Sequence, residues 1–130
     1  MVDVSDLVGT PFVNGGRDVN IGLDCWGLVM EVFRRHGVDV PDFTVDALAF
    51  DKIDAMAGEA SVSRKWEEVF NPSDDAVPLV VLMRVHPIYV THAGVLLGGN
   101  RVIHTIQNAN TVITRVGLLK HRTAGFYRPC

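Results

Sequence analysis

Apolar residues recur at helical spacing in the stretch GLDCWGLVMEVFRRHG, residues 22–37. Asp24 is a favourable N-cap there, and Gly37 is a favourable residue just beyond the C-terminal end. The pattern therefore predicts an amphipathic helix over residues 24–36. Four apolar side chains share one side of this helix: Leu28, Val29, Val32 and Phe33.

Two weaker helical patterns follow, and after them the sequence pattern changes from helix-like to strand-like. DALAFDKIDAMAG (46–58) predicts a second helix, and SRKWEEVF (63–70) predicts a short third one. From residue 79 onward, short runs of β-branched and aromatic residues alternate with turn signals. They predict about five strands, at 79–85, 89–97, 101–106, 111–119 and 124–129. Helices followed by consecutive strands predict an α+β fold with an antiparallel sheet.

Length and composition limit the number of domains and the class of protein. The 130 residues, 48% of them hydrophobic, predict a single domain over residues 1–130. A formal net charge of −3 argues against a nucleic-acid partner. No apolar run reaches the ~18 residues of a membrane span. The N-terminus lacks the basic-then-apolar pattern of a secretory signal, which predicts synthesis in the cytoplasm. Action outside the cell then needs another route, such as a phage particle.

Two of the five histidines fall inside predicted strands. A loop at 98–100 pairs Leu97 with Arg101, and in this register His92 and His104 are diagonal neighbours on one face. A register shift of one residue separates them. A half-buried structural role remains an alternative for either ring. The other three histidines are interpreted as structural or surface residues: His36, His86 and His121.

Cys25 is the first residue after the predicted N-cap. The positive end of the helix dipole lowers a cysteine pKa and favours the nucleophilic thiolate. Alone, such a cysteine is more often a packing residue. Packed against a sheet that carries His92 and His104, Cys25 gains a base and an orienting group, which is the layout of a cysteine nucleophile triad.

These segments resemble the NlpC-type cysteine peptidases, papain-like enzymes that cut bacterial cell-wall peptides. The matching segments are GTPFVNGG (9–16), GLDCWGL (22–28) and THAGVLLGGNRVIHT (91–105). The family pattern is an aromatic-x-x-Gly-Gly stretch, an Asp-Cys-x-Gly-Leu helix start, and two strand histidines twelve residues apart, as in this chain. The order of the segments extends the resemblance over nearly the whole chain.

The resemblance implies a role for each matching residue. Cys25 is the nucleophile, His92 the general base, and His104 the third residue that fixes the tautomer of His92. Asp24 caps the helix and is also associated with the amine end of a peptide substrate. The implied substrate is a peptidoglycan-derived peptide, and the reaction needs neither a metal nor an organic cofactor.

Two residues depart from the family pattern. Phe12 replaces a tyrosine whose hydroxyl helps to hold the oxyanion, and Trp26 replaces a serine. Both are expected in the substrate cleft. Trp26 either packs beneath the helix or lies on the cleft rim, and we predict the rim, because Leu28 and Val29 already supply an inward face. The Asp-Cys-Trp-Gly-Leu-Val variant and the GFYRP close resemble the branch found in bacteriophage tail proteins, which implies tail proteins as partners and action at the wall.

Three alternatives stay open. One is a non-catalytic tail or interaction module with the same fold, which Phe12 favours. Another is an acyl-transfer enzyme acting on a thioester, lipid or side-chain amide, because a triad specifies chemistry better than substrate. A zinc site is disfavoured, because the chain has no paired Cys-x-x-Cys or His-x-x-x-His spacing.

Overall fold

The computed structural model describes residues 3–40, 66–73, 76–84 and 92–129. Within them the main helix is α1 (Cys25–Arg35). Its N-cap is Asp24, whose carboxylate accepts a hydrogen bond from the Gly27 N–H at 2.7 Å. The helix ends at Arg35, with His36 as its C-cap, and the following Gly37 adopts φ +77°. The helix predicted over 24–36 is confirmed.

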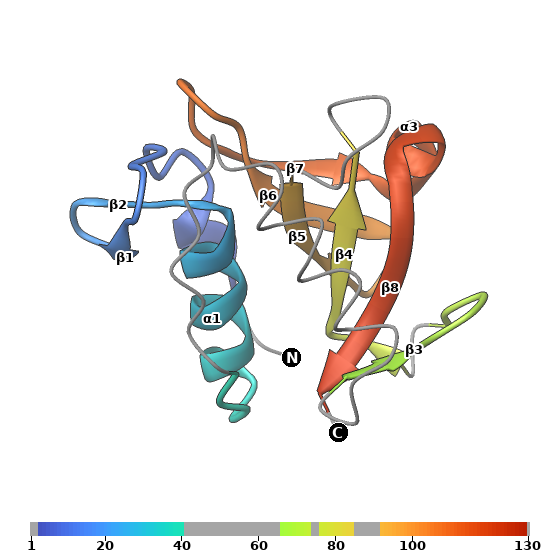
Figure 1. The fold of residues 1–130 in the computed structure, drawn as a ribbon. Helices are drawn as coiled ribbons and strands as arrows, with labels where there is room; N and C mark the ends of the chain where they lie inside the picture. Colours follow the sequence, from blue (N-terminus) through green and yellow to red (C-terminus); the bar gives the residue numbers. More distant parts are fainter. Residues whose placement is uncertain (1–2, 41–65, 74–75, 85–91, 130) are drawn as a thin grey trace.

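Six strands form one antiparallel sheet in the order β3-β8-β4-β5-β6-β7 (Figure 1). A separate two-stranded ribbon, β1 (Arg17–Asp18) and β2 (Gly22–Leu23), leads into α1. Short helical turns precede β1 and β8: η1 (Ser5–Leu7), α3 (Val116–Leu119) and η3 (Lys120–Arg122). The strands of the large sheet are β3 (Trp66–Glu68), β4 (Leu79–Met83), β5 (His92–Leu97), β6 (Arg101–Thr105), β7 (Thr111–Arg115) and β8 (Thr123–Pro129).

The sheet separates two apolar layers. On one face, Val80 and Leu82 of β4 pack with the buried side of α1, and Figure 1 shows α1 lying beside the sheet. On the other face, alternate residues of the same strand join a second cluster: Leu79, Val81 and Met83, with Leu96, Val102 and Leu119. This explains why LVVLM is a continuous apolar run, since a strand covered on both faces needs apolar side chains on both.

Residues 66–68 form a strand, so the helix predicted over 63–70 is wrong for its described part. β3 pairs with the end of β8, with Glu67 opposite Arg128. The guanidinium of Arg128 contacts both carboxylate oxygens of Glu67, at 3.0 and 3.1 Å. An eight-residue helix is too short to be stable by itself, and the sheet edge supplies the backbone partners that decide the outcome.

Of two further predictions, the strand over 111–119 is only partly correct and the helix over 46–58 is not tested. The run 111–119 is not one strand, because β7 ends at Arg115 and residues 116–119 turn into α3. The helix predicted over 46–58 lies outside the described residues, as do His86 and Cys130. In the described part of the chain, the helices are too short or too polar to cross a membrane.

The β5–β6 hairpin has the predicted register. Leu97 pairs with Arg101, and Val95 pairs with Ile103. The turn between the strands places Gly99 and Asn100 at positive φ, +75° and +58°. This register puts His92 and His104 on the same face, because side chains alternate along a strand.

Candidate active site

The segment before α1 holds the start of the helix through its glycines. The Leu23 and Asp24 N–H groups donate to the carbonyls of Pro11 and Gly16. A Cβ on Gly27 would lie 2.2 Å from the Gly16 carbonyl oxygen, so only glycine permits this contact. Gly16 of the Gly-Gly stretch and Gly27 of the helix therefore contact each other through their backbones, and this contact positions Cys25.

Asp24 is 1% exposed and its carboxylate is held by three donors. Besides the Gly27 N–H, it accepts from the Gly15 N–H at 3.2 Å and from the Arg17 guanidinium at 2.5 Å. The capping role is confirmed. Contact between Asp24 and the amine end of a substrate stays a prediction.

Cys25 is a free thiol, 4% exposed, on the first turn of α1. Burial, reinforced by the negative charge of Asp24, raises its pKa to about 11, although the N–H groups of Ala93 and Trp26 oppose the shift. The expectation of a lowered pKa is therefore wrong for this state, because desolvation of the thiolate outweighs the helix dipole. Cys25 and Ala93 belong to the same buried cluster, so the thiol lies against β5, beside the residue that follows His92.

His92 and His104 form a direct pair. His92 Nε2 lies 3.1 Å from His104 Nδ1, which is hydrogen-bond distance. The ring centroids are 5.3 Å apart and the planes meet at 67°. Two rings from diagonal positions on neighbouring strands thus meet as the hairpin register predicts.

Burial lowers the pKa of both histidines. For His92 the pKa falls from 6.5 to about 3, with the neighbouring His104 as a second cause. For His104 burial is the cause of the lowered pKa. The resting site consequently holds a neutral thiol and neutral imidazoles.

Two residues that the sequence analysis missed complete this pair. The Thr114 hydroxyl lies 3.0 Å from His104 Nε2. Gly94 provides space, because a Cβ there would lie 2.9 Å from His104 Cβ and 2.8 Å from the Ile103 carbonyl. A glycine inside a strand run signals such a close approach, whereas no sequence signal distinguishes Thr114 from the other threonines.

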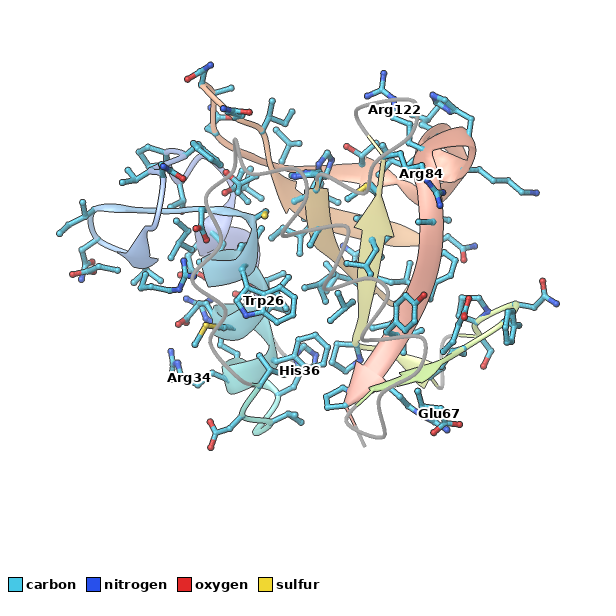
Figure 2. All side chains as sticks on the ribbon, in the orientation of Figure 1. Trp26, Arg34, His36, Glu67, Arg84 and Arg122 are labelled. Carbon is cyan, nitrogen blue, oxygen red and sulfur yellow. The ribbon has the colours of Figure 1, made fainter. Side chains whose placement is uncertain are left out.

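Trp26 is not on a cleft rim. Its side chain is 1% exposed and belongs to the core between α1 and the sheet, toward which Figure 2 shows the ring pointing. The prediction of a rim position is wrong, since Leu28 and Val29 do not fill the inward face by themselves. Phe12 is partly exposed and pairs through its backbone with Leu23, two residues before Cys25. Its place near the substrate stays a prediction.

Metal-ligating side chains do not gather in the described part of the chain: no three His, Cys, Asp or Glu side chains there could share an ion. The arrangement that does exist is a buried thiol at a helix start, a neighbouring strand, and two hydrogen-bonded imidazoles. A protonated thiol of this kind becomes a nucleophile when an imidazole takes its proton.

A helix that carries a cysteine at its first turn and packs on an antiparallel sheet defines a papain-like α+β fold. Among known families, the model of the NlpC/P60 family matches residues 9–125, and the chain belongs to that family.

Individual relatives agree with this assignment. The chain is 33% identical over 101 residues to the tail tip assembly protein K of Escherichia phage N15; the match covers 75% of this chain and 38% of that protein. A lipoprotein-like NLP/P60-family protein of Staphylococcus aureus shares the fold, with TM-score 0.58 and 20% identity over 95% of this chain and 37% of the other. The NlpC/p60 domain of the peptidoglycan hydrolase SagA does likewise, with TM-score 0.58 and 22% identity over 95% of this chain and 90% of that domain.

Proposed function

We propose that the chain is a cysteine peptidase that hydrolyses amide bonds in peptides of bacterial peptidoglycan, as a component of a phage tail. The observation that carries the proposal is the hydrogen bond of 3.1 Å between His92 of β5 and His104 of β6. Ala93, the residue after His92, places its backbone N–H against the Cys25 thiol. Membership of a family of cell-wall peptidases supports the substrate class.

In the proposed reaction the Cys25 thiol is the nucleophile. His92 takes the thiol proton as the sulfur attacks the scissile carbonyl carbon. The tetrahedral oxyanion accepts a hydrogen bond from the Cys25 N–H, at the start of α1, where backbone donors face outward. His92 then returns the proton to the leaving amine, and a thioester remains on Cys25.

The second half of the reaction regenerates the enzyme. His92 removes a proton from a water molecule as the water oxygen attacks the thioester carbonyl carbon. The carbon–sulfur bond then breaks, the carboxyl product leaves, and the Cys25 sulfur takes back the proton that His92 holds. During both halves His104 holds the His92 ring through the hydrogen bond at its Nε2. No proton or electron leaves this cycle, so the chain's own residues suffice for it.

Purified wall fragments test the proposal directly. The wild-type chain is expected to release peptide products that mass spectrometry identifies, and Cys25→Ala and His92→Ala are expected to release none above background. His104→Gln is expected to keep part of the activity, since an amide can still orient an imidazole, whereas loss of an acid–base group costs about 10²–10⁴-fold. Full activity of His92→Ala contradicts the triad.

A non-catalytic assembly role is the second candidate, and the likeness to a tail tip assembly protein favours it. The two candidate functions predict different infection by a phage whose tail carries the Cys25→Ala variant. A purely structural role predicts that a phage carrying Cys25→Ala assembles and infects normally. The enzymatic role predicts intact tails whose infection fails at the wall, and correct melting of the purified variant shows that folding is not the cause.

A further inference from the structure

The Thr114 hydroxyl extends the histidine pair into a chain of three groups. His92 Nε2 lies 3.1 Å from His104 Nδ1, and His104 Nε2 lies 3.0 Å from Thr114 Oγ1. β6 and β7 hold this geometry, because Thr114 pairs with Val102, two residues before His104. Three polar groups from three neighbouring strands are thus aligned on one face of the sheet.

The two hydrogen bonds in this chain must point in the same direction. A neutral imidazole carries one N–H and one bare nitrogen. If His104 donates from Nε2 to Thr114, its Nδ1 is bare and must accept from His92 Nε2–H. If Thr114 instead donates to His104 Nε2, then His104 Nδ1–H donates to His92 Nε2.

The direction decides whether His92 can act as a base. Its Nε2 faces His104, so its Nδ1 is the nitrogen left for the thiol proton. In the first direction Nδ1 is bare and can accept that proton. In the second direction Nδ1 already carries the hydrogen, and the ring cannot take another without giving up its bond to His104.

We propose that Thr114 is a positioning residue: its hydroxyl accepts a hydrogen bond from His104 Nε2–H, and this leaves His92 Nδ1 as the basic nitrogen. The same direction also fits the protonated state, because imidazolium His92 still donates from Nε2 to His104 Nδ1. The proton can therefore arrive and leave without any reversal of the chain. For its effect on catalysis this inference rests on the proposed function.

Thr114→Val tests the proposal, because valine keeps the shape of threonine and removes the hydroxyl. His104 Nε2–H then loses its acceptor, and the pair is expected to reverse, with the hydrogen of His92 on Nδ1. We expect kcat on wall peptides to fall roughly 10- to 100-fold, part of an acid–base contribution of about 10²–10⁴. KM is expected to change little, and Thr114→Ser is expected to restore most of the rate.

Ring tautomers supply a readout independent of activity. Two-bond proton–nitrogen spectra of the full chain carrying Cys25→Ala are expected to show hydrogen on Nε2 of both rings, and on Nδ1 of both after Thr114→Val. Thr105→Val is the matched control on β6, since the buried Thr105 hydroxyl has no hydrogen-bond partner among the described residues. It is expected to leave both tautomers unchanged.

The outcomes separate this inference from the proposed function. Hydrogen on Nδ1 of His104 in the Cys25→Ala chain with Thr114 intact overturns the inference, whatever the activity of the wild type. Unchanged tautomers and kcat in Thr114→Val also overturn it. If the spectra show the expected tautomers with Thr114 and the expected reversal with Thr114→Val, but the wild-type chain cleaves no wall peptide, the positioning role stands and the peptidase proposal fails.

Discussion

At the scale of single residues, Cys25 shows how burial competes with a favourable position. The partial positive charge at the start of the helix favours the thiolate, and such an interaction typically contributes about 0.3–1 kcal/mol. Against it stand near-complete burial and the carboxylate of Asp24, the adjacent residue. The charge of Asp24 was visible in the sequence, but the burial of Cys25 depends on its packing against β5, which is distant in the chain.

Alkaline pH is expected to destabilise the fold through Cys25. Its pKa in the folded chain, about 11, lies above the ordinary 9.0, so the protonated thiol stabilises the fold below pH 9, and this contribution is lost as pH rises through 11. Two pKa units correspond to roughly 3 kcal/mol. Urea unfolding of wild type and Cys25→Ala at several pH values measures it.

The comparison with the alanine variant isolates the thiol, because all other titrating groups are common to both chains. The free energy of unfolding of the wild type is expected to fall more steeply than that of Cys25→Ala over this pH range. Parallel curves would mean that the thiol titrates normally in the folded chain.

At the scale of elements, the approach of β5 to β6 depends on Gly94. Its missing side chain lets the His104 side chain and the Ile103 carbonyl approach from β6. The adjacent residues Ala93 and Val95 are fully buried, so the strand has no room to shift sideways. The glycine is thus part of the device that brings the histidine rings together.

Gly94→Ala is expected to destabilise the chain by about 1–3 kcal/mol, as overpacking does. The same change should separate the two rings and lower the turnover of wall peptides. Gly98→Ala is the matched control at the end of the same hairpin, since a Cβ there meets nothing within 4 Å. Equal melting temperatures and equal activities of the two variants contradict this role of Gly94.

Helix α1 docks on the sheet through Trp26, so truncation of that ring should be costly. Trp26→Ala is expected to lower the free energy of unfolding by about 3–5 kcal/mol. The ratio of kcat/KM between two wall peptides should remain unchanged. Phe70→Ala, at an aromatic ring that is 76% exposed, is the control and should melt like the wild type. A shifted ratio with unchanged stability would restore the rim interpretation.

The elements differ in how far local sequence determines them. α1 has a cap, a stop and a full apolar stripe, and the β5–β6 hairpin has a short turn, so both were predictable. β3 was not, because Glu67 pairs with Arg128, which lies 61 residues further along the chain. The histidine pair followed from the register of β5 and β6 alone. Its link to Thr114 depends on the register of β6 against β7, which the sequence analysis did not predict.

At the scale of the whole molecule, one sheet serves two apolar layers. Val80 and Leu82 face the layer under α1, while Val81 and Met83 face the layer that includes Leu119 of α3. If the sheet unfolds, the apolar residues of both layers become exposed together. This coupling favours unfolding of the described layers in a single step, as small domains commonly show.

Coincident unfolding transitions are therefore expected from probes of different parts of the molecule. The chain has two tryptophans, so Trp66→Phe leaves Trp26 as the sole fluorescent reporter of the layer under α1. Far-ultraviolet circular dichroism reports the sheet that both layers share. In urea the two signals should give the same midpoint and slope. As a control, circular dichroism should give the same midpoint and slope for the wild type and for Trp66→Phe. If Trp26 becomes exposed at a lower urea concentration than that at which the sheet signal is lost, α1 detaches as a separate unit, and the prediction of one domain over residues 1–130 is contradicted.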